Sequence, residues 1–119
     1  MHNLEKLEIW RKAMDLVTQV YIVISNLPKD EQYGLTSQIK RCAISIPSNI
    51  AEGAGRNSNK EFIYFLGIAQ GSSYELKTQL LLTSELRLIT KKEITKIITD
   101  LEEIQKMNFS FQSYLKSNV

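Results

Sequence analysis

Helical character is clearest between residues 90 and 115, where the sequence is TKKEITKIITDLEEIQKMNFSFQSYL. Apolar side chains recur every three or four positions, which places them on one face of a helix. These side chains are Ile94, Ile97, Ile98, Leu101, Ile104, Phe111 and Leu115. Thr90 and Glu93 form a capping box, because a hydroxyl and a carboxylate three residues apart can satisfy free amide groups at a helix start. The pattern predicts a helix over residues 91–115.

Three further helices are predicted upstream of this segment. A second capping box, Ser58 and Glu61, marks the start of a helix over residues 59–86. Breaks at Pro28 and at Gly53 to Asn57 separate two more, over residues 7–26 and 31–54. The core stripe expected for the first helix consists of Trp10, Ala13, Met14, Val17, Val20, Tyr21 and Ile24. Strand-like alternation is absent over any useful length. We therefore predict one all-α domain over residues 1–119, an antiparallel up-down-up-down four-helix bundle.

Pro47 lies inside the second predicted helix. Proline removes one backbone hydrogen bond and clashes with the preceding turn, at a cost of about 3 kcal/mol unless the helix bends. We therefore expect the second helix to be kinked at Pro47, with the hydroxyl of Ser45 or Ser48 helping to satisfy the freed backbone groups.

Composition limits the classes of protein to which the chain can belong. It has 119 residues, 43% hydrophobic and 24% charged, with a net charge of +2. This is typical of a globular protein and excludes a disordered chain. No apolar run approaches the roughly 20 residues of a membrane span, and a signal peptide is not expected. The single cysteine, Cys42, cannot form an internal disulfide, so we expect a cytoplasmic location.

Candidate catalytic and metal-binding residues are scarce. The only histidine, His2, is expected in a fraying terminus, and Cys42 has no cysteine or histidine near it in the sequence. Zinc sites and carboxylate-bridged di-iron bundles both need such ligands. On the core stripe Cys42 is interpreted as a small apolar residue. We predict a protein that is not an enzyme and that has no catalytic residue, cofactor, metal or small-molecule substrate.

The third helix carries more apolar surface than a monomer needs. Opposite its core stripe lies a second seam made of Tyr64, Gly67, Ile68, Gly71 and Tyr74. Glycine inside a helix costs about 1 kcal/mol relative to alanine, so two glycines spaced by four favour the close approach of another backbone. Tyrosines beside them suit an interface, because they are apolar with a polar tip. The pattern predicts self-association through this seam.

Several polar positions leave a choice between structural and binding roles. Lys40, Arg41, Arg56 and Lys60 are candidate nucleic-acid contacts, although the charges along the chain are spread evenly and a solvated flank is the favoured interpretation. Residues 53–60 combine glycines and cations at a helix start, which is typical of an anion site, but a helix C-cap followed by an N-cap is the favoured interpretation of the same residues. Gln105 and Asn108 fall on the apolar side of the last helix, where buried amides usually fix register.

The residues resemble a known family between Trp10 and about Leu86. The most specific part is Ser45-Ile46-Pro47-Ser48-Asn49-Ile50-Ala51-Glu52-Gly53, with further matches around Tyr33-Gly34-Leu35 and Glu75-Leu76. The chain is similar to small four-helix-bundle proteins encoded within intervening sequences of bacterial 23S rRNA genes, which are related to retroelement accessory variability proteins. The resemblance implies a homo-oligomer, frequently a ring-like pentamer, without catalytic residues. RNA or a nucleic-acid-handling protein is the further partner that it implies.

Overall fold

The computed structural model describes residues 2–118 and is all-helical over that range. Four long helices follow one another: α1 (Glu8–Ile24), α2 (Leu35–Ala54), α3 (Asn59–Glu85) and α4 (Lys91–Lys116). Two single 3₁₀ turns, η1 (Leu4–Lys6) and η2 (Lys29–Glu31), precede α1 and α2. The all-α class and the number of helices predicted from the sequence are confirmed.

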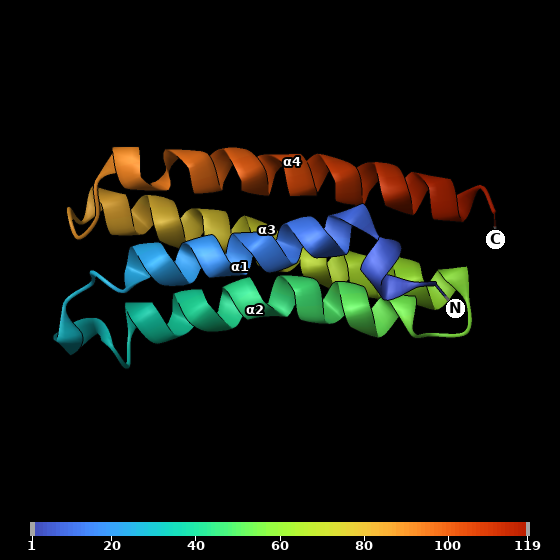
Figure 1. Ribbon diagram of the computed structural model, residues 1–119, viewed down its shortest axis with the longest axis horizontal. Coiled ribbons are helices and arrows are strands. Elements are labelled where there is room, and N and C mark those ends of the chain that lie inside the picture. Colours follow the sequence, from blue (N-terminus) through green and yellow to red (C-terminus); the bar gives the residue numbers. More distant parts are fainter. Residues whose placement is uncertain (1, 119) are drawn as a thin grey trace.

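The helices pack side by side in an elongated molecule with principal extents of 46 × 23 × 20 Å. Both α1 and α3 pack against α2 and against α4. In Figure 1 the α1–α2 and α3–α4 connections lie at one end of the long axis, and the α2–α3 connection lies at the other. Each helix therefore has two neighbours, and each has an outer face directed away from the core.

Side chains at the helix starts explain where α3 and α4 begin. The Thr90 box is complete, because the Thr90 hydroxyl accepts from the Glu93 amide at 3.2 Å and a Glu93 carboxylate oxygen accepts from the Thr90 amide at 2.7 Å. At α3 only half of the predicted box forms, since the Ser58 hydroxyl accepts from the Glu61 amide. The Glu61 carboxylate lies 4.0 Å from Arg56 instead.

Pro47 is buried within α2, which is continuous as an α-helix from Leu35 to Ala54. Around it the polar side chains bond one another. The Asn49 side-chain nitrogen donates to the Ser45 main-chain carbonyl at 2.8 Å, and the hydroxyls of Ser45 and Ser72 are 2.8 Å apart. The Ser45 hydroxyl thus links α2 to α3 and is not used on the backbone as expected.

The face of α1 that is buried differs from the predicted core stripe. Ile9 and Leu16 are buried, whereas Met14 and Tyr21 from the expected stripe are exposed. The helix is apolar over about half its circumference, so periodicity alone could not fix which part faces inward. The remaining buried side chains of α1 are Ala13, Val20 and Ile24.

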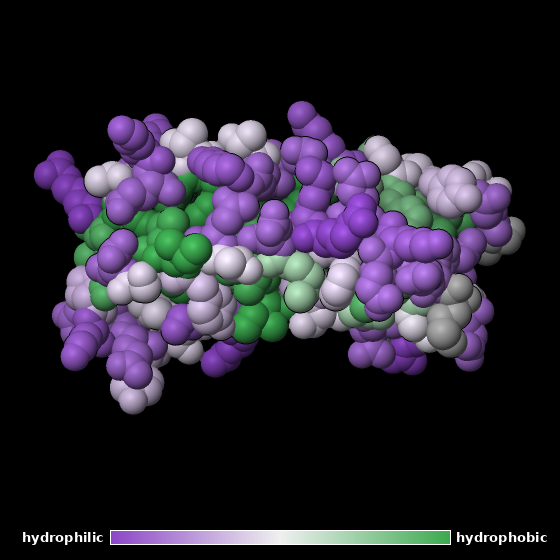
Figure 2. Space-filling view, viewed as in Figure 1, coloured by the Kyte–Doolittle hydropathy of each residue, from purple (hydrophilic) through white to green (hydrophobic). Residues whose placement is uncertain are grey.

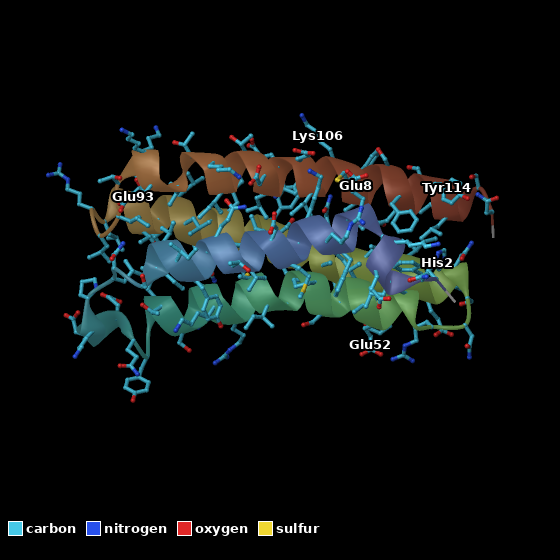
Figure 3. All side chains as sticks on the ribbon, in the orientation of Figure 1. His2, Glu8, Glu52, Glu93, Lys106 and Tyr114 are labelled. Atoms are coloured by element: carbon cyan, nitrogen blue, oxygen red, sulfur yellow. The ribbon has the colours of Figure 1, made fainter. Side chains whose placement is uncertain are left out.

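His2 is held against the bundle, which corrects the expectation of a fraying terminus. Its ring centroid lies 4.9 Å from that of Phe62 and 6.2 Å from that of Phe111, with edge-on geometry. Its amide donates to the Ala54 carbonyl at 3.2 Å. Figure 3 shows His2 at the end of the molecule where α2 turns into α3.

Candidate functional site

The seam predicted on the third helix lies on the outer face of α3. Tyr64, Gly67, Ile68, Gly71 and Tyr74 are all exposed. The two tyrosines are 65% and 58% exposed, and Ile68 is 38% exposed. The buried side chains of α3, among them Leu66, Ala69, Leu76 and Leu80, lie on the opposite side of the helix. Within residues 2–118, all five seam residues therefore remain exposed on the surface.

The two seam glycines have open space in front of them. A Cβ atom built on Gly67 or on Gly71 would have no heavy atom within 4 Å, apart from chain neighbours and the helix's own backbone. No contact among residues 2–118 of one copy therefore requires glycine at either position. Neither residue has a positive φ angle, so backbone conformation does not require glycine there either.

Gly53, at the end of α2, has the opposite surroundings. A Cβ there would lie 2.7 Å from the Phe62 ring, 2.9 Å from the Phe65 Cβ and 3.2 Å from the Phe62 carbonyl oxygen. This is the close helix approach that needs glycine within the chain, between α2 and α3. From the sequence, Gly53 belongs to a helix break, to the candidate anion segment and to the family motif. A packing role could not be predicted, because the closeness of Phe62 and Phe65 depends on tertiary structure.

The four candidate nucleic-acid contacts lie in two separate pairs. Lys40 and Arg41 are in the first half of α2, while Arg56 and Lys60 flank the α2–α3 turn, roughly 20 Å away at 1.5 Å per residue. The Lys40 ammonium lies 5.1 Å above the Tyr21 ring. The Arg56 guanidinium pairs with Glu52 at 2.9 Å and lies 4.9 Å from the Phe65 ring. Two of the four charges are therefore engaged within the chain.

Cys42 joins a polar contact between α2 and α3. Its thiol lies 3.1 Å from the Ser72 carbonyl oxygen and 3.5 Å from a Glu75 carboxylate oxygen. Burial, together with the Glu75 carboxylate, raises the pKa of the Cys42 thiol to about 12. The thiol is therefore protonated at neutral pH and is a poor nucleophile. Among residues 2–118 no group of three or more potential metal ligands is found.

The two amides of α4 differ in their surroundings. The buried Asn108 amide donates to the Leu66 carbonyl at 3.0 Å and accepts from Gln112 at 2.6 Å, as a register-fixing amide should. Gln105 is also buried, but its side-chain nitrogen has no hydrogen-bond partner within the described chain. The main-chain carbonyl oxygen of Gln105 accepts from the side-chain nitrogen of Gln70 at 3.0 Å.

The protein belongs to the class of four-helix proteins. The outer face of its longest helix, α3, is not covered by another helix among residues 2–118. The family model of the 23S rRNA-intervening sequence protein matches residues 5–110, so the chain belongs to that family. The resemblance stated from the sequence is confirmed. Within residues 2–118 we find no helix that is long and apolar enough to span a membrane.

A crystal structure with a similar fold supports the same assignment. It is that of a protein with unknown function from the S23 ribosomal protein family of Bacteroides thetaiotaomicron VPI-5482. The two chains share 26% identity and a TM-score of 0.78, over 87% of this chain and 97% of the other. None of the curated proteins matches the chain.

Proposed function

We propose that the protein is a non-enzymatic helical scaffold that self-associates through the outer face of α3. The observation that carries the proposal is the seam itself, in which exposed Tyr64, Ile68 and Tyr74 flank two glycines with open space in front of them. Each glycine weakens α3 by about 1 kcal/mol relative to alanine. The backbone of a second copy passing close to Gly67 and Gly71 offsets this cost.

A second apolar face suits a ring better than a symmetric dimer. Met14 and Val17 of α1, with Ile44 and Pro47 of α2, line a groove of about 390 Å³. Figure 2 shows hydrophobic side chains interrupting a mainly hydrophilic face along the line between α1 and α2. A two-fold interface buries one patch against its own copy, whereas a ring joins two different patches. We infer a ring of identical subunits from these two patches, and a homopentamer from the family resemblance.

The oligomer is tested by size-exclusion chromatography with light scattering at micromolar concentration. The expected mass is five times the chain mass of 13.7 kDa. Replacing Gly71 by arginine places a long charged side chain in the seam and should give monomers, because a buried unpaired charge is costly. Thr95→Arg, on an exposed position of α4, is the matched control and should leave the mass unchanged. A wild-type protein of 13.7 kDa would refute the assembly.

Two finer features of the fold belong to the same proposal. The alternating ends of the connections in Figure 1 support antiparallel neighbours throughout the bundle. The missing amide of Pro47, buried in α2, supports a bend at that residue.

The lone protonated thiol of Cys42 fits a reducing compartment, and we infer a cytoplasmic location.

RNA, or a protein that handles nucleic acid, is the second candidate partner. Arg41 and Lys60 are exposed and have no ion pair within 4.0 Å among residues 2–118. Lys40 and Arg56 would complete the contact after leaving their aromatic neighbours. Binding through phosphates weakens steeply as salt rises, so gel shifts of structured RNA across a salt series test this candidate. The absence of any shift at low salt would remove it.

A further inference from the structure

An open groove of about 710 Å³ lies between α3 and α4 on the outside of the bundle. Its walls are formed by Gln70, Tyr74, Glu102, Gln105, Lys106, Phe109 and Ser110. In Figure 3 the Lys106 side chain extends from α4 away from the other helices. None of these residues except Tyr74 belongs to the proposed seam, and none belongs to the four basic candidates.

The walls of the groove contain a buried donor and a buried acceptor that the described chain leaves unpaired. The Gln105 side chain is only 8% exposed, and its amide nitrogen has no partner. The side-chain oxygen of Gln70 is also buried without a partner. Leaving such a group unsatisfied costs about 1–3 kcal/mol. The Gln70 side-chain nitrogen donates to the main-chain carbonyl oxygen of Gln105, so the Gln70 side chain lies against the α4 backbone at Gln105, and both residues line the same groove.

Aromatic and charged groups surround the two amides. Phe109 is 70% exposed and Tyr74 is 58% exposed, so both present ring faces that core packing does not use. Lys106 has no ion pair within 4.0 Å among residues 2–118, whereas Glu102 is paired with Lys77 at 2.9 Å. The one carboxylate in the groove is therefore neutralised, and the Lys106 ammonium is free.

We propose that this groove binds a nucleobase together with its 5′-phosphate. Every nucleobase has a hydrogen-bond donor next to an acceptor on one edge, and glutamine amides pair with such edges, most often with adenine. The base donates to the Gln70 oxygen and accepts from the Gln105 nitrogen. Its flat faces stack on the Phe109 and Tyr74 rings, and Lys106 binds the phosphate as a point charge. The volume is in the range of small-molecule sites.

The ligand comes either from a free nucleotide or from an unpaired base of RNA, since both carry this chemistry. A peptide main chain also offers a donor beside an acceptor. It does not use two exposed ring faces and a free ammonium together, so the nucleobase fits the groove better. The groove shares only Tyr74 with the proposed seam, so the test measures binding and mass separately.

Titration calorimetry of the full chain with AMP at low salt is the test. AMP should bind at least tenfold more tightly than inorganic phosphate, and N6,N6-dimethyl-AMP, which lacks the exocyclic donor, should bind more weakly than AMP. Gln105→Met removes the unpaired amide at similar volume, so thermal stability should be unchanged or higher while AMP affinity falls about tenfold. Lys106→Ala should also weaken AMP binding, and Lys92→Ala on the same helix should not.

Comparing AMP, single-stranded oligoadenylate and a duplex RNA identifies the source of the base. Tighter binding of the single strand than of AMP would indicate unpaired RNA, and equal affinity would indicate a free nucleotide; either result supports the groove. Three results would overturn the proposal: AMP binding no better than phosphate, undiminished binding by Gln105→Met, or binding of a glutamine-containing peptide but of no nucleotide. Light scattering of the same samples reports on assembly independently.

Discussion

Gly53 and the pair Gly67 and Gly71 lie in neighbouring helices, yet their surroundings are opposite. Gly53 faces Phe62 and Phe65 with no room for a methyl group, while Gly67 and Gly71 have no atom within 4 Å of a Cβ position. The first glycine is explained by the fold of one chain. The other two are not, although each weakens its helix by about 1 kcal/mol.

The contrast separates two kinds of sequence signal that look alike. A glycine required by packing within the chain must lower stability when it is replaced. A glycine required by a partner must raise the stability of the isolated chain when it is replaced, and lower the affinity for the partner. The sign of the change in unfolding free energy, when each glycine is replaced by alanine, therefore shows which of the two roles that glycine has.

The largest effect is expected for Gly53→Ala. The new methyl group would lie under 3.0 Å from the Phe62 ring and the Phe65 Cβ, and neither neighbour is the free end of a flexible side chain. Overpacking costs about 1–3 kcal/mol, and two contacts under 3.0 Å point to the upper part of that range, which exceeds the gain of about 1 kcal/mol in helix propensity. Urea unfolding should show a net loss of up to about 2 kcal/mol.

Gly55→Ala is the matched control. Its Cβ would have ordinary contacts of 3.7 Å with the carbonyl oxygens of Ala51 and Glu52, and its φ of −84° suits alanine. Stability should stay within about 0.5 kcal/mol of the wild type, as at most surface positions. If Gly53→Ala proved as stable as Gly55→Ala, α2 and α3 would not be as close as they are here.

The second prediction concerns the double variant Gly67→Ala, Gly71→Ala. Both methyl groups have room, so the isolated chain should gain about 1–2 kcal/mol in unfolding free energy. Self-association should weaken at least tenfold, because the added carbons hold the second backbone away. Unfolding is measured at a concentration where the mass is that of a monomer, and association by light scattering across a dilution series.

The two measurements have to be considered together. A gain in stability with unchanged association would show that the glycines face solvent in the assembled protein and would remove the seam from the interface. A loss of stability would show that the outer face of α3 is in contact within the chain, contrary to the open space in front of both residues.

Much of the fold could be predicted from the sequence because its signals are local. The box of Thr90 and Glu93 and the three-and-four spacing on α4 depend on residues within a few turns, and the structure reproduces both. Which face of α1 is buried depends on the neighbouring helices. The apolar pattern therefore predicts a buried Met14, whereas the side chain is exposed. The need for glycine at position 53 depends on two aromatic residues of another helix and was not predictable.

The candidate sites divide in the same way. The α3 seam was found because a surplus of apolar and glycine positions is visible in one helix. The α3–α4 groove was missed because Gln70 and Gln105 come from different helices. The sequence does not show that the Gln70 side-chain oxygen and the Gln105 side-chain nitrogen lack hydrogen-bond partners among residues 2–118 of the folded chain. In the sequence Gln105 and Asn108 look alike, as amides on the apolar side of one helix, and only the hydrogen bonds of the structure distinguish them.

The smallest effect is expected at the two helix starts, where a complete box at Thr90 contrasts with half a box at Ser58. Hydrogen bonds from the Thr90 amide and hydroxyl lower the pKa of Glu93 below its ordinary 4.5. A lowered pKa in the folded state means that the stabilisation is present above about pH 4.5 and is lost as the pH falls through the folded value. Glu93→Gln should therefore melt slightly below the wild type at pH 7, and the difference should shrink as the pH falls below 4.5 and disappear once the wild-type carboxylate is protonated. A difference in melting temperature that stayed constant throughout the acid titration of the carboxylate would mean that the Glu93 charge does not stabilise the start of α4.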